Sequence, residues 1–182
     1  MTTANPLEMF WSRVNYGEWE FALAATTRGL TYVGSPSMFD EEAGVWINRW
    51  YPGCRLIEDD HRCQPYIIQL LEYLQSERTL FELPLDWRGT PFQLAVWEAL
   101  NDIPYGETRS YSDIAQQLGK PAAVRAVGTA IGANPILVIV PCHRVIAKNG
   151  ALAGFRGGLA MKTKLLELES EGAKLLAAAE SG

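Results

Sequence analysis

The residues that decide the fold are Ile136-Leu137-Val138-Ile139-Val140-Pro141-Cys142-His143-Arg144-Val145. The five apolar residues from Ile136 to Val140 predict a strand that is buried on both faces. Pro141 has no amide donor, so it ends the hydrogen-bonded ladder of that strand. We therefore expect the fold to present Cys142 at a turn. The alternative is that Cys142 is only a small buried apolar residue, as free cysteines commonly are.

The neighbours of Cys142 favour a reactive thiol. His143 and Arg144 are residues of the kind that lowers the pKa of a cysteine and makes its thiolate available. A histidine, with an ordinary pKa of about 6.5, also accepts a proton at neutral pH. Adjacent side chains in an extended chain diverge, so a water molecule is expected to relay the proton to His143. The last helix offers two acceptors for the other ring nitrogen, Glu167 and Glu169, and the sequence does not choose between them.

The residues before the apolar run predict three helices. Thr90-Pro91 is typical of a helix start, and the apolar residues from Phe92 to Leu100 then share one helical face. Residues 110–118 and 122–131 predict two short helices, joined by the turn Gly119-Lys120-Pro121. This pair resembles a helix-turn-helix, although any compact helical hairpin looks similar.

The N-terminal half predicts strands and helices. Residues 19–33 suit a β-hairpin with its turn at 26–29, and residues 41–50 and 64–75 carry helix-spaced apolar residues. The prolines and glycine of residues 83–91 indicate a domain boundary after Leu85. Beyond the cysteine we expect a glycine-rich loop at 150–158, a helix at 159–168 and a frayed tail from Ala173 onward.

Composition limits the class of protein. With 182 residues and 48% hydrophobic content, the chain fits one medium or two small globular domains, and no apolar run suits a membrane span. We expect a soluble, intracellular protein, cytoplasmic or, in a eukaryote, nuclear. Three cysteines at irregular spacing argue against a disulfide framework, and Cys54, His61 and Cys63 are too few and too irregular for a convincing zinc site.

The net charge of −5 conceals a division along the chain. Residues 1–85 hold six Lys and Arg against twelve Asp and Glu, whereas residues 86–164 hold nine against five. Such an imbalance arises by chance in many proteins, but it directs attention to the second segment as a candidate anion-binding face.

The motif Pro141-Cys142-His143-Arg144-Val145, preceded by Asn134-Pro135, resembles the active-site motif of the O6-alkylguanine-DNA alkyltransferases. The likeness runs in order from about Phe92 to Glu169 and includes, in chain order, Tyr105-Gly106, Ser110-Tyr111, Arg125-Ala126-Val127-Gly128 and Gly157-Gly158-Leu159. The N-terminal half resembles the family only in its length and its mixed strand-helix pattern.

The resemblance implies an α+β fold in two domains. Residues 1–85 would form a ribonuclease-H-like domain with a small antiparallel sheet. Residues 86–170 would form a helix-turn-helix (winged-helix-like) domain that carries the nucleophile, and residues 171–182 a flexible tail.

The implied activity is direct-reversal DNA repair. Cys142 would take an alkyl group irreversibly from O6-alkylguanine in double-stranded DNA, and O4-alkylthymine is left open as a substrate. The damaged nucleotide would be flipped out of the stack, because a thiolate cannot reach it there. No cofactor or metal is implied, and the thioether product limits each molecule to one turnover.

The resemblance also implies roles for single residues. His143 would relay the proton of Cys142 through water, with Glu169 as the orienting acid. Tyr111 would help to rotate the phosphate and protonate the departing guanine. Arg125 would fill the gap left by the flipped base.

Further family positions concern the pocket and the DNA contacts. Asn134 would tie the recognition helix to the site, and main-chain groups of Cys142, Val145 and Arg156 would recognise guanine. Phe155 replaces a tyrosine of some relatives, which keeps stacking but removes a hydroxyl. The small residues Ala126, Gly128, Ala130 and Gly132 allow close approach to a DNA backbone or merely close helix packing. The phosphates would meet some of the basic residues Lys120, Arg125, Arg144, Lys148 and Arg156.

Three other functions compete with this interpretation. A cysteine hydrolase would use Cys142 and His143 but would turn over and need an oxyanion site. A non-catalytic damage binder of the alkyltransferase-like kind would lack the nucleophile. A two-function transcriptional regulator would need a cysteine-rich zinc site in residues 1–85. We expect a monomer, and the sequence leaves open the preferred alkyl group, cooperative binding along DNA, and the role of the acidic N-terminal half.

Overall fold

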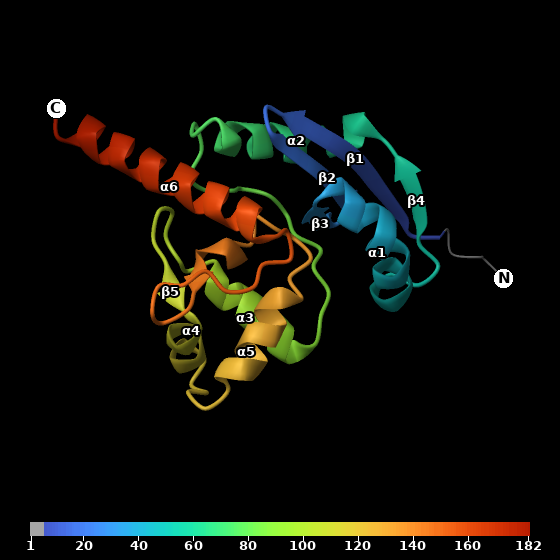
Figure 1. The fold of residues 1–182 in the computed structure, drawn as a ribbon. Coiled ribbons are helices and arrows are strands. Elements are labelled where there is room, and N and C mark those ends of the chain that lie inside the picture. The colour runs from blue at the N-terminus through green and yellow to red at the C-terminus, as the bar shows by residue number, and fades with distance from the viewer. Residues whose placement is uncertain (1–5) are drawn as a thin grey trace.

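The computed structural model describes residues 6–182, and its N-terminal half is a four-stranded sheet with helices on both faces (Figure 1). The elements are β1 (Glu8–Tyr16), β2 (Trp19–Thr26), β3 (Gly29–Gly34), α1 (Pro36–Trp50), β4 (Arg55–Glu58) and α2 (Asp60–Leu74). The strand order is β3-β2-β1-β4, with β1, β2 and β3 antiparallel and β4 parallel to β1.

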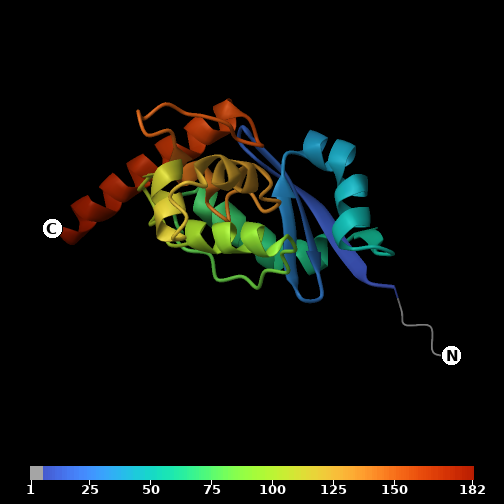
Figure 2. The same ribbon diagram turned by 90° about the horizontal axis from the view of Figure 1, so that it is seen from below.

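Alternation along the strands sends side chains to two separate cores. On one face, residues such as Met9 and Tyr32 pack against Phe39 and Ile47 of α1. On the other face, residues such as Phe21 and Leu30 join a larger core with α2 and the C-terminal half. Figure 2 shows the sheet between α1 and the helices of the C-terminal half.

The hairpin predicted at residues 19–33 is confirmed as β2 and β3. The antiparallel sheet is only part of the arrangement, because β4 pairs in parallel with β1 and neither strand was predicted. Both N-terminal helices begin earlier than their apolar spacing indicated. Ser35 caps α1 and Asp59 caps α2 through their side chains, and Pro65 lies inside α2.

The C-terminal half is mainly helical. It contains α3 (Pro91–Leu100), β5 (Arg109–Ser110), α4 (Tyr111–Gln117), α5 (Val124–Gly132), the 3₁₀ turn η1 (Cys142–Arg144), β6 (Val145–Ile146) and α6 (Leu159–Glu180). Thr90 and Ser110 form capping boxes at the starts of α3 and α4. The three helices predicted before the cysteine are confirmed, and α4 and α5 form the expected helix pair. The chain is therefore of the α+β class.

The predicted strand at residues 136–140 is wrong. Only Ile136 forms a bridge, with Val33 of β3, and the following residues make turns in which Val138 has a φ of 71°. All five residues are nevertheless buried, so the burial expected of them is correct. An apolar run indicates burial but not hydrogen-bond geometry. Here the buried backbone is bonded by turns, by Asn134 and by the single bridge to Val33, instead of by a continuous sheet ladder.

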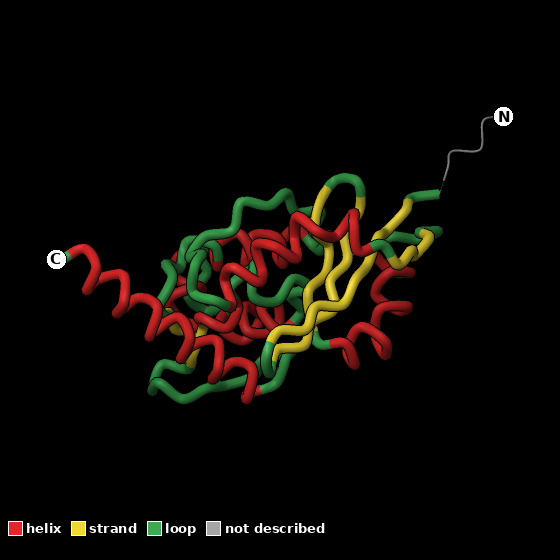
Figure 3. The backbone as a smooth tube through the Cα atoms, turned by 90° about the horizontal axis from the view of Figure 1, so that it is seen from above, coloured by secondary structure: helices red, strands yellow, loops and turns green. Residues whose placement is uncertain are grey.

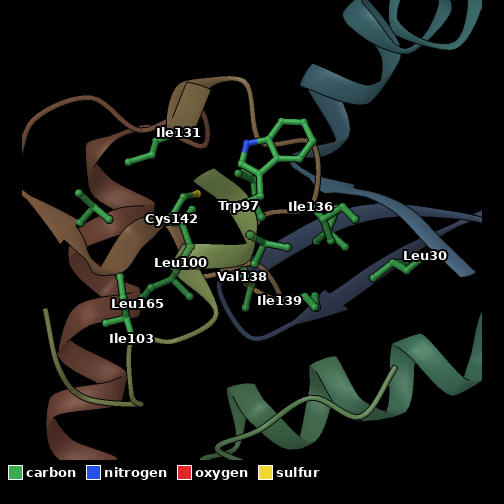
Figure 4. Close-up of a cluster of buried hydrophobic side chains, with 14 of the residues drawn as sticks. Leu30, Trp97, Leu100, Ile103, Ile131, Ile136, Val138, Ile139, Cys142 and Leu165 are labelled. Carbon is green, nitrogen blue, oxygen red and sulfur yellow. The ribbon is translucent and has the colours of Figure 1, made fainter. Parts of the chain in front are cut away.

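The two halves of the chain share backbone hydrogen bonds and one core. The amide of Leu30 donates to the carbonyl of Pro84 in the linker at 2.9 Å, and the amide of Leu137 donates to Val33 at 3.0 Å. Figure 4 shows Leu30 of the sheet, Trp97 and Leu100 of α3, and Cys142 in the same apolar cluster. The boundary after Leu85 therefore divides the sequence without dividing the core.

The last helix was predicted to end at Leu168, which is wrong, because α6 continues to Glu180. Residues 171–180 are therefore helical. Gly172 does not stop the helix: a Cβ there would collide with the hydroxyl of Tyr105, so the glycine permits close packing. Figure 3 shows the end of α6 projecting beyond the body of the molecule. Within residues 6–182 no helix has the length and apolar character needed to cross a bilayer.

Candidate active site

Cys142 lies at the start of η1, just after the buried turns that follow α5. Its amide donates to the carbonyl of Val140 at 2.8 Å, and the residue is only 3% exposed. Its sulfur points into the apolar cluster of Figure 4. The expectation that a turn presents the cysteine is confirmed, although a strand does not lead to it.

Asn134 holds the thiol and the turn together. Its Nδ2 donates to Sγ of Cys142 at 3.2 Å and to the carbonyl of Val140 at 3.1 Å, while its Oδ1 accepts from the amide of Ile136 at 2.9 Å. Asn134 is fully buried two residues after the end of α5. It is therefore in a position to tie α5 to the reactive sulfur, the role that the family resemblance implied.

His143 pairs with a buried acid through one of its two ring nitrogens. Its Nε2 lies 2.8 Å from Oε1 of Glu169, and its Nδ1 is buried without a hydrogen-bond partner in the described structure. Glu169 is buried and Glu167 is exposed, so the structure chooses between the two acids left open by the sequence. Burial lowers the pKa of His143 although Glu169 opposes the shift, so the imidazole is a neutral acceptor at neutral pH.

Glu169 is the centre of a larger polar cluster. Besides His143, it accepts from Nε of Arg144 at 2.9 Å and from the hydroxyl of Tyr73 at 2.6 Å. Gly106 adds its amide at 3.3 Å. Burial alone would raise the pKa of this carboxyl, but hydrogen bonds from His143 and Arg144, together with the charge of Arg144, outweigh it and lower the pKa to about 2.

The expectation that Arg144 lowers the pKa of the thiol, or meets phosphate, is wrong. Its guanidinium is buried, paired with Glu169, and bonded to the carbonyl of Ile103. Burial raises the pKa of Cys142 to about 11, although Asn134 and Lys162 oppose the shift. The resting sulfur is therefore a neutral thiol at pH 7, and its proton has to leave during the reaction.

Lys162 is a buried cation that sequence reasoning missed. Its Nζ donates to the carbonyls of Val145 at 2.6 Å and of Ala153 at 3.0 Å, and the residue is 0% exposed. A lysine at a helix position beside apolar residues is ordinarily a solvated one, so no pattern in the sequence indicated its burial. It fixes the main chain on both sides of the loop that follows the cysteine.

The loop before α6 contacts the helix pair and the N-terminal half. The hydroxyl of Tyr111, at the start of α4, donates to the carbonyl of Ala153 at 2.7 Å. Burial raises the pKa of Tyr111, so it is a protonated phenol at neutral pH. Arg156 forms an ion pair with Glu42 of α1, and Phe155 is half-buried against the main core.

The candidate DNA-binding residues lie on and around α5, away from the sheet. Arg125 and Ala126 are exposed on α5, beside a groove between α3 and α5 that Thr90 and Phe92 also line. Lys120 is exposed with its ammonium 5.1 Å from the ring of Phe92. Gly128 instead faces Tyr111: a Cβ there would lie 3.7 Å from its ring, which fits helix packing.

The two cysteines of the N-terminal half differ in their burial. Cys63, a residue of α2, is buried in the main core, and Cys54 is half-buried. Within residues 6–182, no three His, Cys, Asp or Glu side chains are grouped closely enough to bind a metal ion.

Comparison with known proteins gives consistent similarities. Residues 91–171 match the sequence profile of the 6-O-methylguanine DNA methyltransferase, DNA binding domain. The inducible methylated-DNA–protein-cysteine methyltransferase of Bacillus subtilis is 53% identical over 93% of this chain and 94% of its own length. The crystal structure of the Mycobacterium tuberculosis O6-methylguanine methyltransferase aligns with a TM-score of 0.78 at 40% identity, over 90% of this chain and 93% of that one. The M. tuberculosis OGT in complex with DNA gives 0.77 at 40% identity, over 90% and 94%.

Proposed function

The chain belongs to the 6-O-methylguanine DNA methyltransferase family, and from that premise we propose that Cys142 is the residue that receives the alkyl group. The protein is a methylated-DNA–protein-cysteine methyltransferase that binds DNA and repairs it by direct reversal. The assignment of Cys142 rests on one arrangement: Asn134 holds its sulfur, and the next residue, His143, forms a buried pair with Glu169.

The substrate is O6-alkylguanine in double-stranded DNA, and the transfer is a single displacement. The sulfur of Cys142 attacks the alkyl carbon in line, a carbon–sulfur bond forms, and the bond from that carbon to O6 of guanine breaks. The thiol proton passes through a water to Nδ1 of His143, whose lone pair is free because Nε2 faces Glu169. The phenol of Tyr111 gives its proton to the departing guanine. The thioether is not hydrolysed, so each molecule acts once.

The base reaches the thiol by leaving the duplex. Cys142 is too deeply buried to meet a stacked base, which supports flipping of the damaged nucleotide. The exposed Arg125 of α5 enters the vacated space, with Ala126 next to it against the minor groove and Lys120 near the phosphates. Gly128 keeps Tyr111 close to α5.

The pocket for guanine is made mainly of backbone. Main-chain groups of Cys142, Val145 and Arg156 recognise the edge of the base, and Phe155 stacks on it. Lys162 supports this arrangement, because it fixes the carbonyl of Val145 at 2.6 Å. We assign no cofactor or metal, a monomeric state and a cytoplasmic location.

The proposal is tested by mixing excess protein with a duplex that contains one O6-methylguanine, followed by mass measurement of the protein and its peptides. We expect one added methyl group on the Cys142 peptide, product that never exceeds protein, and no transfer by Cys142→Ser. Multiple turnovers would favour a hydrolase, and an unmodified Cys142 with retained DNA binding would favour a damage-recognition protein.

Acid should slow the transfer at a defined point. His143 must be neutral to accept the proton, and burial lowers its pKa. The rate should therefore hold as the pH falls through about 6.5 and decline only below it. A decline centred above pH 6.5 would argue against His143 as the acceptor.

A further inference from the structure

We propose that Tyr73, a residue of the N-terminal half, is a positioning residue that tunes His143 by sharing the acceptor oxygen of Glu169. This inference rests on the proposed function, in which His143 accepts the proton of Cys142. It goes beyond that function because it gives the acidic N-terminal half a part in the chemistry.

The geometry brings three side chains to one carboxylate oxygen. The hydroxyl of Tyr73, near the end of α2, donates to Oε1 of Glu169 at 2.6 Å, and Nε2 of His143 lies 2.8 Å from the same atom. Arg144 adds Nη2 at 2.8 Å. Tyr73 and Glu169 are 0% and 1% exposed, so water does not replace these contacts.

The tyrosine ring is held as firmly as its hydroxyl. It packs against Phe81 with ring centroids 5.2 Å apart, and edge-on against Tyr105 at 6.1 Å. Burial and the adjacent Glu169 raise the pKa of Tyr73 far above its usual value, so it keeps its proton and remains a donor. The hydroxyl therefore has one rotor position that suits it, toward Glu169.

Donors that share an acceptor oxygen reduce its negative charge for one another. The hydrogen bond from Tyr73 makes Oε1 a weaker acceptor for Nε2–H of His143, and so makes protonated His143 less stable. The other charged groups that act on His143 are Arg144 of η1 and Lys162 of α6. Neither residue belongs to the N-terminal half of the chain, so Tyr73 is the residue that connects this half to His143.

The test uses Tyr73→Phe, which removes the hydroxyl and keeps the ring. Tyr66→Phe is the matched control, because Tyr66 lies on the same helix, half-buried, and is not a partner of Glu169. The readout is the nitrogen and ring-proton spectrum of ¹⁵N-histidine-labelled protein. The chain has only two histidines, and exposed His61 serves as an internal reference.

In Tyr73→Phe the Nε2–H proton of His143 should move downfield, as its bond to Glu169 strengthens, while His61 stays in place. The acid limb of the rate of alkyl transfer should move to higher pH by about 0.5 unit or more, the equivalent of one modest hydrogen bond. Tyr66→Phe should change neither. Site-specific 3-fluorotyrosine at position 73, a more acidic phenol and stronger donor, should shift the resonance upfield.

An unmoved His143 resonance in Tyr73→Phe, with the fold intact by its remaining spectrum, overturns the inference and makes the tyrosine a packing residue only. The spectrum does not require alkyl transfer. It therefore separates a failure of this inference from a failure of the proposed function, which the mass measurement on Cys142 decides.

Discussion

Replacement of Glu169 by glutamine keeps the shape of the side chain and removes its charge from a site that is 1% exposed. The guanidinium of Arg144 is then buried without a counterion, and loss of one partner of a buried ion pair costs roughly 3–5 kcal/mol. The pKa gives a second figure. A fall from 4.5 to about 2 corresponds to about 3 kcal/mol of stabilisation at neutral pH, at roughly 1.4 kcal/mol per unit.

The same pKa fixes the pH dependence of the loss. Because folding lowers the pKa of Glu169, its stabilisation is fully present above about pH 4.5 and disappears as the pH falls toward 2. Urea unfolding of the native protein and Glu169→Gln should therefore differ by about 3 kcal/mol at pH 7, and the two curves should converge in acid. The control is Asp40→Asn, which breaks an exposed ion pair with Arg13 and should cost less than about 1 kcal/mol.

Two results would refute this reasoning. A loss below about 1 kcal/mol at pH 7 would mean that water or another group satisfies Arg144. A loss of the expected size that did not change between pH 5 and pH 3 would mean that the charge of Glu169 is not its cause.

Three further predictions follow from other contacts. Iodoacetamide should label Cys142 more slowly than half-exposed Cys54 at pH 7.5, with acceleration toward the Cys142 pKa of about 11; peptide masses measure this, and equal rates would contradict a buried neutral thiol. Lys162→Met should lower the free energy of unfolding by about 2 kcal/mol or more and weaken binding of free O6-methylguanine, because loop carbonyls lose their donor; unchanged calorimetric affinity would show that the clamp does not shape the pocket. Gly29→Ala should lower the melting temperature markedly, because its Cβ would lie 2.5 Å from the carbonyl of Pro84, and an unchanged melt would show that the linker yields easily.

The sequence predicted best those elements whose signals are local. Thr90-Pro91 and Ser110 mark helix starts by side-chain caps, and the structure has both. The apolar run before Pro141 misled because apolarity reports burial and not hydrogen-bond geometry. In the fold, Asn134 supplies bonds that a sheet partner would otherwise supply, and that role is not visible in residue order.

The candidate site was predicted as far as its residues are close in sequence or match a family motif. Cys142 and His143 could be chosen from their neighbours, whereas Glu169 needed the resemblance. Tyr73 contacts Glu169 across 96 residues, and nothing in the sequence distinguishes it in this respect from Tyr66, the other tyrosine of the same amphipathic helix. Lys162 was missed because its burial depends on the carbonyls of Val145, Ala153 and Gly154, whose positions cannot be seen in the order of residues.

The burial of Cys142 has a consequence for the protein after it has reacted. The sulfur is part of a close-packed cluster with Val145 and Leu165, in which spare volume for an added carbon is small. A methyl group replaces the thiol proton and presses on the neighbouring side chains, and such overpacking typically costs about 1–3 kcal/mol. The methylated protein should therefore be less stable than the unmodified one, so a molecule that has carried out repair should also have a shorter lifetime.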